Sequence, residues 1–243
     1  MAISRWAWAA FNALQLVFTL LWTAGWICAA LLVLLLTRRR TLPLRMAARC
    51  WAPGLLRGSG ATLVVRGLER VDWTRPHVLV ANHQSMIDIC ALFRAVPVPL
   101  QFLLKQELSR VPFVGAYARA MGMIFVERSS ARDARRRMHE AAGLVKAGAT
   151  LCVFPEGTRS RDGEVLPFKS GAFQVALDAG ADVVPVAIEG SGKVLSLGGI
   201  FRVRPGTITL TFGTPLPTQT IADRQVLAEQ ARERVVAMKR EAA

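Results

Sequence analysis

Cysteine, histidine and tyrosine are scarce in this chain, which has four, three and one of them in 243 residues. The cysteines form no Cys-x-x-Cys pair and stand in apolar surroundings. We therefore expect reduced thiols in a cytoplasmic protein, and neither a disulfide framework nor a metal site. The single tyrosine, with no zinc-finger spacing and no RNA-recognition signature, argues against a nucleic-acid partner. The cysteines are Cys28, Cys50, Cys90 and Cys152.

Acidic residues are also few. The chain has 17 Asp and Glu against 31 Lys and Arg, a formal net charge of +14, while 52% of its residues are hydrophobic. This combination predicts an anionic partner that is reached from an apolar surface. A membrane with acidic lipids fits it better than nucleic acid does.

Charge is absent altogether from residues 6–37. A helix of that length, at about 1.5 Å per residue, exceeds the roughly 30 Å hydrocarbon core of a bilayer and the core of a signal peptide. It could cross with tilt or bend within the membrane, so the number of crossings stays open. Arg38, Arg39 and Arg40 follow the stretch and only Arg5 precedes it, which predicts the rest of the chain on the cytoplasmic side of the cytoplasmic membrane. Four polar residues make its first half less apolar: Asn12, Gln15, Thr19 and Thr23.

Residues 41–56 mix Arg45 and Arg49 with leucines and a tryptophan. They predict an interfacial amphipathic helix whose arginines meet lipid phosphates, bent or broken at Pro53-Gly54. A solvated linker with scattered basic residues is the alternative. We therefore predict membrane-anchoring helices over residues 1–58 and an α/β domain over residues 59–243.

Short apolar runs and helical patterns alternate along the predicted α/β domain, residues 59–243. This alternation predicts a mixed, mostly parallel sheet flanked by helices. The expected strands cover residues 63–67, 78–81, 100–104, 123–126, 150–154, 183–188 and 208–212, and the expected helices cover residues 87–96, 131–147, 172–179 and 223–240.

The segment from Asn82 to Asp88 joins a predicted strand to a predicted helix. His83 is thereby placed at the carboxyl edge of a sheet, where α/β proteins bind ligands. Ser85 is expected to cap the helix. Asp88 could reach back to the imidazole, fix its tautomer and leave the other ring nitrogen to take a proton. The alternative is that Asp88 only completes a capping box.

A second polar segment, residues 154–160, follows the strand at 150–154. Gly157 lets the backbone approach a ligand, Thr158 supplies a hydroxyl, Arg159 suits a phosphate and Glu156 could accept hydrogen bonds from hydroxyl groups. The segment is not a Walker A loop, and neither is Gly190-Ser191-Gly192-Lys193, which lacks the required flanking residues.

Two more basic residues close predicted strands, Lys105 and Arg128. In a largely parallel sheet they would gather with Arg159 at the edge that carries His83. Such an arrangement predicts a phosphate site next to a general base.

The two segments together resemble the glycerophospholipid acyltransferases, above all the bacterial 1-acyl-sn-glycerol-3-phosphate acyltransferases. Four blocks match in order, and the resemblance covers roughly residues 64–212. The blocks are residues 83–88, 122–128, 154–160 and 184–188. In members of this family the second block often carries Asp-Arg, where this chain has Glu127-Arg128.

The resemblance implies the glycerolipid acyltransferase fold and a direct acyl transfer without a cofactor. His83, oriented by Asp88, would deprotonate the free sn-2 hydroxyl of 1-acyl-sn-glycerol 3-phosphate, and the oxygen would attack the thioester of acyl-CoA or acyl-carrier protein. The product would be phosphatidic acid, an intermediate of phospholipid synthesis. The resemblance also implies that Lys105, Arg128 and Arg159 hold the acceptor's phosphate, and that Glu156, Gly157 and Thr158 help to position the acceptor.

Three alternatives stay open. The acceptor could be another lysolipid, such as lyso-ornithine lipid, because the motifs specify acyl transfer and no head group. A serine or cysteine hydrolase would need an acyl-enzyme, and the chain has no Gly-x-Ser-x-Gly elbow, with Ser85 and Cys90 as the nucleophile-type residues near His83. A membrane-bound protein that merely binds anionic lipid would leave the pairing of the two motifs unexplained.

Overall fold

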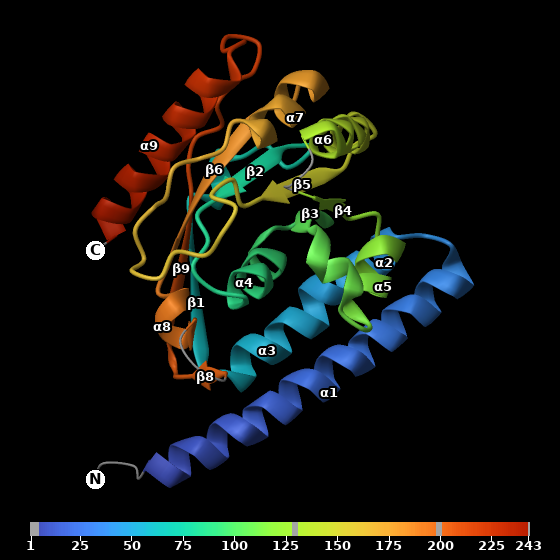
Figure 1. Ribbon diagram of the computed structural model, residues 1–243, viewed down its shortest axis with the longest axis vertical. Coiled ribbons are helices and arrows are strands. Elements are labelled where there is room, and N and C mark those ends of the chain that lie inside the picture. Colours follow the sequence, from blue (N-terminus) through green and yellow to red (C-terminus); the bar gives the residue numbers. More distant parts are fainter. Residues whose placement is uncertain (1–4, 128–130, 198–200, 243) are drawn as a thin grey trace.

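A seven-stranded sheet forms the centre of the protein, as seen in a computed structural model that describes residues 5–127, 131–197 and 201–242 (Figure 1). Its strand order is β1-β9-β6-β2-β5-β3-β4. All pairs are parallel except β6 with β9, so the sheet is mixed and mostly parallel, as predicted. The strands are β1 (Ala61–Arg66), β2 (Val78–Ala81), β3 (Leu100–Lys105), β4 (Ile124–Val126), β5 (Thr150–Val153), β6 (Val183–Glu189) and β9 (Gly206–Phe212).

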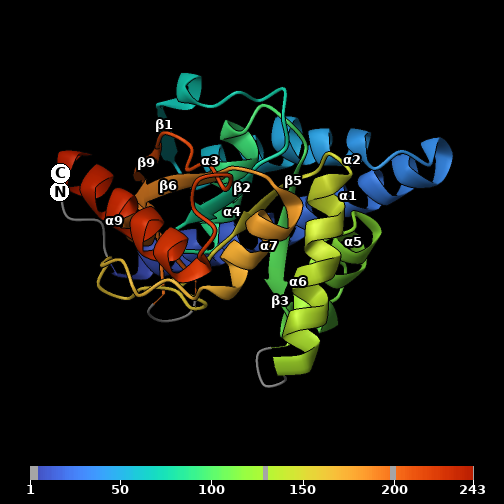
Figure 2. The ribbon, with the colours of Figure 1, turned by 90° about the horizontal axis from the view of Figure 1, so that it is seen from above.

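Helices cover both faces of the sheet (Figures 1 and 2). Alternate residues of each central strand face opposite sides, so that Leu79 belongs to one core cluster while Val78 and Val80 belong to the other. The first cluster includes α4 (Ile87–Ala95) and residues of the N-terminal helices. The second includes α6 (Ala131–Lys146), α7 (Gly171–Ala179) and α9 (Arg224–Ala242). All four residues of β2 are buried, which explains why that strand reads as a continuous apolar run.

Several short elements were not predicted. They interrupt the regular alternation after β1, after β3 and after β6. They are α5 (Val114–Ala120), α8 (Ser191–Val194), the pair β7 (Leu195–Ser196) and β8 (Arg202–Val203), and 3₁₀ turns at Leu68–Arg70 and Gln106–Arg110.

From Arg5 to Gly58 the chain is helical except at residues 38–40, in α1 (Arg5–Thr37), α2 (Thr41–Met46), a π-helical segment (Ala47–Trp51) and α3 (Ala52–Gly58). The apolar side of residues 41–58 packs on the protein, because Leu44, Leu55 and Leu56 are buried in the same core cluster as α4. These three leucines therefore pack on the protein, whereas Leu42 is exposed, and the contact of this segment with a membrane interface stays a prediction. Arg45 and Arg49 are exposed. The helix also continues through Pro53, which stands in the first turn of α3, where its missing N–H is tolerated.

The long helix α1 turns its polar stripe toward the rest of the protein. Asn12 Oδ1 accepts a hydrogen bond from the Val203 N–H at 2.7 Å, and Thr23 Oγ1 accepts one from Trp51 Nε1 at 3.1 Å. Gln15 is 8% exposed. The polar residues at spacings of three and four therefore mark the side of the helix that packs on the domain.

Two glycines on α3 let α1 approach closely. A Cβ on Gly54 would lie 2.3 Å from the Trp22 ring, and a Cβ on Gly58 would lie 2.6 Å from the Phe18 ring. Trp22 also donates a hydrogen bond from Nε1 to the Trp51 carbonyl at 3.1 Å. Trp22 thus packs between helices, whereas Trp6 is 86% exposed.

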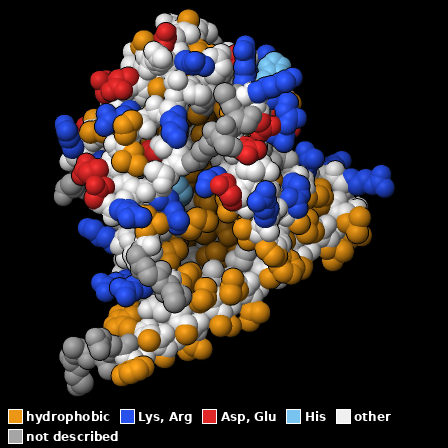
Figure 3. Space-filling model, viewed as in Figure 1, with side chains coloured by type: hydrophobic (Ala, Val, Ile, Leu, Met, Phe, Trp, Pro, Cys, Tyr) orange, Lys and Arg blue, Asp and Glu red, His pale blue; other side chains and the backbone are white. Residues whose placement is uncertain are grey.

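The outer side of α1 is apolar and exposed. Leu14, Leu21 and Leu35 are 72%, 69% and 73% exposed. By length and composition, residues 6–37 form one helix that could cross a membrane, with a mean hydropathy of 2.2 in its most apolar window. Figure 3 shows hydrophobic side chains along this helix and in a hollow between it and the body of the protein.

Candidate active site

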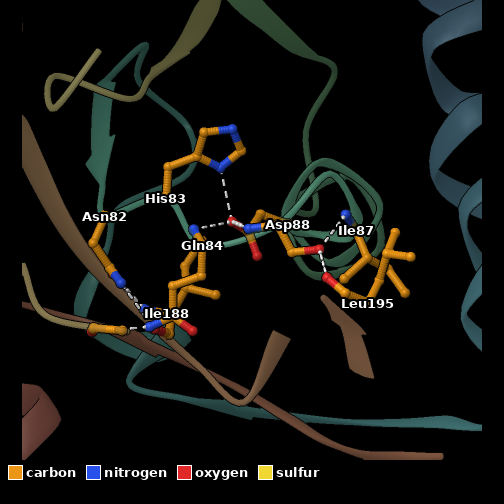
Figure 4. Close-up of polar contacts among 9 residues, drawn as sticks. Asn82, His83, Gln84, Ile87, Asp88, Ile188 and Leu195 are labelled. Carbon is orange, nitrogen blue, oxygen red and sulfur yellow. Dashed lines mark hydrogen bonds and ion pairs between the residues drawn. The ribbon is translucent and has the colours of Figure 1, made fainter. Parts of the chain in front are cut away.

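His83 and Asp88 meet directly after β2, as the sequence predicted. The His83 Nδ1 and Asp88 Oδ2 atoms lie 2.8 Å apart, and the Asp88 side chain is completely buried. A carboxylate oxygen accepts, so Nδ1 carries the proton and donates it. Figure 4 shows the other ring nitrogen, Nε2, pointing away from Asp88. The pair therefore presents an acceptor nitrogen held in one tautomer.

The same carboxylate oxygen also organises the start of α4. Asp88 Oδ2 accepts hydrogen bonds from the backbone N–H groups of Gln84 at 2.8 Å and Ser85 at 2.9 Å. Ser85 contributes to the cap of the helix, as predicted, because its Oγ accepts a hydrogen bond from the Ile87 N–H at 3.4 Å, although Met86 is the residue that directly precedes the helix. Ser85 Oγ also donates to the Leu195 carbonyl at 2.7 Å. Asp88 thus both holds the turn and orients the imidazole.

Asn82 fixes the point at which the chain leaves the sheet. Its Nδ2 donates to the Ile188 carbonyl at 2.9 Å, and its Oδ1 accepts from the Ile188 N–H at 2.7 Å (Figure 4). The buried amide thereby continues the pairing of β2 with β6 by one more step and sets the direction in which His83 emerges. Its role was missed, since the sequence does not tell which strand neighbours β2.

Phe154 packs flat against the imidazole. Its ring centroid lies 3.9 Å from that of His83, with an angle of 17° between the planes. Phe154 directly follows β5, the other neighbour of β2, so sheet pairing brings the rings together. This contact leaves the ring of His83 little freedom to rotate.

The segment after β5 is bound to the His83 segment through its backbone. The Ser160 N–H donates to the His83 carbonyl at 2.8 Å, and Gln84 Nε2 donates to the Gly163 carbonyl at 3.3 Å. Gly157 has φ +75°, in a turn closed by its N–H on the Phe154 carbonyl at 3.1 Å. Glycine is the residue that adopts this conformation without a steric penalty. Thr158 and Arg159 are exposed beyond it.

Glu156 is buried, which differs from its expected contact with the acceptor. Its side chain is 4% exposed, and burial raises its pKa to about 8. The N–H groups of His83 and Leu166 lower this pKa in part, although neither makes a hydrogen bond of normal geometry to the carboxyl among the described residues. Glu156 therefore lies buried near the backbone of His83 and Leu166 and is not exposed to an acceptor.

The predicted phosphate contacts are spread along the edge. Lys105 ends β3, and its Nζ lies 2.7 Å from Glu107 Oε1, with 53% of the side chain exposed. Arg159 is exposed on the loop after β5. Arg128 lies outside the described residues. β3 and β6 flank the strands that carry Phe154 and His83, so Lys105 and the turn after β6 stand on opposite sides of the base.

An apolar cavity of about 280 Å³ opens between α1 and the α/β domain. Its walls include Met86 and Ile87, which follow His83 closely in the chain, and Leu195. Helix α1 contributes residues from Gln15 to Ala30. A cavity with this lining suits an acyl chain.

A second, polar hollow of about 1090 Å³ begins at Gln84. The loop from Thr158 to Glu164 forms one wall, and the turn from Glu189 to Lys193 forms another, joined by Lys239 of α9. Gln84 borders this hollow while Met86 borders the apolar cavity, so both spaces adjoin the short segment that carries His83.

The nucleophile that a hydrolase would need is not provided by the nearby candidates. Burial raises the pKa of the Cys90 thiol to about 12, so it carries no thiolate at neutral pH. The Ser85 hydroxyl donates to Leu195, not to His83. This geometry favours direct transfer over an acyl-enzyme.

Residues 62–189, more than half of the chain, match the family described as Acyltransferase. The chain belongs to this acyltransferase family. The match ends at the last residue of β6 and contains both segments around His83.

This acyltransferase is similar to several known proteins. It is 36% identical over 161 residues to a 1-acyl-sn-glycerol-3-phosphate acyltransferase of Chlamydomonas reinhardtii, covering 66% of this chain and 48% of that one. It is 32% identical over 197 residues to the 1-acyl-sn-glycerol-3-phosphate acyltransferase of Saccharomyces cerevisiae, covering 79% and 64%. The chain thus spans about half to two thirds of the length of these relatives.

The fold is shared with a solved structure along almost its whole length. The crystal structure of the 1-acyl-sn-glycerophosphate (LPA) acyltransferase PlsC from Thermotoga maritima superposes with a TM-score of 0.78 and 28% sequence identity. It covers 94% of this chain and 96% of its own, so the helices before β1 are part of the comparison.

Proposed function

We propose that this protein transfers an acyl group from a thioester to the sn-2 hydroxyl of 1-acyl-sn-glycerol 3-phosphate and forms phosphatidic acid. The observation that carries the proposal is the His83–Asp88 pair, with Nδ1 held at 2.8 Å and Nε2 turned away from Asp88, three residues before Met86 in the wall of an apolar cavity. The names of the similar proteins from Chlamydomonas reinhardtii and Thermotoga maritima support the choice of acceptor.

In the proposed step His83 Nε2 removes the proton of the acceptor hydroxyl. The oxygen forms a bond to the thioester carbonyl carbon, and the tetrahedral intermediate then expels the sulfur. The thiolate takes the proton back from the imidazolium, so the products are an ester and a free thiol. Asp88 stabilises the imidazolium between these two proton transfers. Backbone N–H groups near Gly157 could polarise the carbonyl.

Arg159 and Lys105 are proposed to hold the phosphate of the acceptor, together with Arg128. Arg159 offers a planar fork for phosphate oxygens, and Lys105 would exchange its pairing with Glu107 for the phosphate. Gly157 and Thr158 would position the glycerol. The acyl chain would occupy the apolar cavity behind Met86.

We propose that α1 lies in one leaflet of the membrane with its outer leucines in lipid. The helix contacts the domain from Asn12 to Leu34, so it does not stand free as a separate crossing. The basic residues near it, including Arg45 and Arg49, would meet anionic lipid head groups. We place this leaflet on the cytoplasmic side of the cytoplasmic membrane, because Arg38, Arg39 and Arg40 follow the helix and only Arg5 precedes it.

The deciding experiment is acyl transfer in detergent to lysophosphatidic acid, with acyl-CoA and acyl-carrier protein as separate donors and His83→Ala alongside. We expect phosphatidic acid from the wild type and a loss of about 10²- to 10⁴-fold in the variant. Unchanged thermal unfolding of His83→Ala would show that the loss is chemical. Lysolipid binding without product from any donor would contradict the proposal and favour a lipid-binding protein.

The acceptor is tested with Arg159→Ala. A phosphate-bearing acceptor predicts a rise in the KM for lysophosphatidic acid of about tenfold or more. An equal rate with lyso-ornithine lipid and an unchanged KM in the variant would contradict a phosphate-specific site.

A further inference from the structure

We propose that the polar hollow beside Gln84 binds the water-soluble, phosphate-bearing part of the thioester donor, a coenzyme A moiety, with Arg161 and Lys193 as its phosphate contacts. The inference rests on the proposed acyl transfer and adds a binding site for the water-soluble part of the donor.

The two spaces beside His83 differ in what surrounds them. The apolar cavity is walled by α1, the helix whose outer side is proposed to lie in lipid. Of the described residues that line the polar hollow, none belongs to α1. The acyl chain of a lipid can therefore approach the imidazole from the side of α1, and the water-soluble part of a donor from the side of the polar hollow.

The side chains that line the hollow include four positive and three negative ones, and one of the three carboxylates, that of Asp162, is hydrogen-bonded within its own loop. Asp162 accepts hydrogen bonds from Ser160 Oγ at 2.8 Å and from the Glu164 N–H at 3.0 Å, which lower its pKa. Lys239 Nζ donates to the Gly163 carbonyl. Within the part of the chain that the structure describes, Arg161 and Lys193 form no ion pair, and both are exposed. Two cations thus remain available to an anionic ligand.

Both loops that carry these cations are fastened next to the base. Gln84 Nε2 donates to the Gly163 carbonyl at 3.3 Å, and a Cβ on Gly192 would lie 3.7 Å from Gln84 Cβ. The turn before Lys193 is closed by its N–H on the Gly190 carbonyl at 3.0 Å. Gly190 has φ +77°, and any Cβ there would meet the Thr207 carbonyl. Arg161 and Lys193 therefore occupy fixed places relative to Gln84 and His83.

The hollow is large enough to hold more than the acceptor's phosphate. Its volume of about 1090 Å³ exceeds what one glycerol phosphate needs and is in the range that holds a nucleotide-sized ligand. Arg159, the proposed contact of the acceptor's phosphate, lines this same hollow, so that phosphate would take up only part of it. Coenzyme A carries several phosphates far from its sulfur, and Arg161 and Lys193 are further cations of the wall that would meet them.

The test measures binding of free coenzyme A by calorimetry to His83→Ala protein, so no turnover is needed. We expect the added pair Arg161→Gln and Lys193→Gln to weaken binding about tenfold, as two exposed charge-assisted contacts would. The matched control is Arg135→Gln with Lys146→Gln, two exposed cations on α6, and it should leave binding unchanged. The proposal is overturned if both double variants bind coenzyme A equally more weakly, or if neither binds it more weakly.

A second measurement separates the donor from the acceptor. In otherwise wild-type enzyme, Arg161→Gln with Lys193→Gln should raise the KM for acyl-CoA about tenfold, leave the KM for lysophosphatidic acid unchanged, and have no effect on an acyl-pantetheine donor, which has no phosphate. A rise in the acceptor's KM, or turnover with acyl-carrier protein but no binding of coenzyme A, overturns the proposal. Specific binding of coenzyme A without any transfer would instead contradict the proposed function and leave this site standing.

Discussion

Asp88 Oδ2 accepts three hydrogen bonds, from Gln84, Ser85 and His83, and the substitution Asp88→Asn separates their roles. The amide oxygen can still accept from the backbone, but the charge that stabilises the imidazolium is lost. We expect kcat to fall by about 10²-fold or more while the thermal midpoint falls by only a few degrees. Wild-type kcat in a folded variant would mean that Asp88 is only a capping residue.

Glu156 makes the stability of the protein depend on pH. Its folded pKa of about 8 lies above the ordinary value of 4.5, so the folded protein keeps a proton that the unfolded chain releases. This contribution is fully present below about pH 4.5 and is lost as the pH rises toward about 8. We expect wild type to lose stability relative to Glu156→Gln over this interval, by the order of a few kcal/mol at most. Parallel unfolding midpoints of the two proteins from about pH 5 to pH 8 would contradict this account.

At the residue scale the sequence predicted the acid–base pair but not its surroundings. His83 and Asp88 are five residues apart in one segment, so local turn geometry brings them together. The contacts of Phe154, Asn82 and Ser160 depend on which strands lie next to β2. No local sequence pattern indicates this strand order. The burial of Glu156 also depends on contacts between distant segments.

The contact between α1 and α3 depends on Gly54, and Gly54→Ala tests it. The new Cβ would collide with the Trp22 ring, so α1 must shift and the Trp22–Trp51 hydrogen bond must lengthen. We expect lower stability, changed tryptophan fluorescence and a changed preference for acyl-chain length, since α1 walls the cavity.

The matched control is Gly143→Ala, at a glycine of α6 with open space around its Cβ position. Alanine favours the helix there by up to about 1 kcal/mol, so this variant should be as stable as wild type or more so. A Gly54→Ala protein that behaves like the control would show that α1 is not held by this contact.

The central strands and their helices were predicted within a few residues, because each has an apolar run or period of its own. β9 could not be placed, since pairing antiparallel with β6 and parallel with β1 is decided by packing. The short helix α5 was missed because Pro112 and Gly115 make that stretch look like a loop. The polar residues of α1 were noticed in the sequence, but the side they face became clear only with Val203 and Trp51 beside them.

For the whole molecule, the exposed leucines of α1 predict binding to lipid vesicles. Replacing Leu14, Leu21 and Leu35 with serine should weaken binding to anionic vesicles at least about 100-fold. Activity on a short-chain acceptor in detergent should remain. Val226→Ser, on α9 and 47% exposed, is the control for a surface change elsewhere. Unchanged vesicle binding of the triple variant would contradict the proposed placement of α1.

The positions of the two hollows also bear on how the products part. On the proposed arrangement, phosphatidic acid escapes sideways into the bilayer past α1, and the thiol diffuses into the aqueous phase from beside Gln84. For the reverse reaction, phosphatidic acid would have to return to His83 from the membrane and the thiol from water. Because a thioester is a stronger acyl donor than an ester, the equilibrium already favours the products, and dilution of the thiol into bulk water lowers the reverse rate further. A boundary between phases, placed by a single helix, would thus separate the two products as they form.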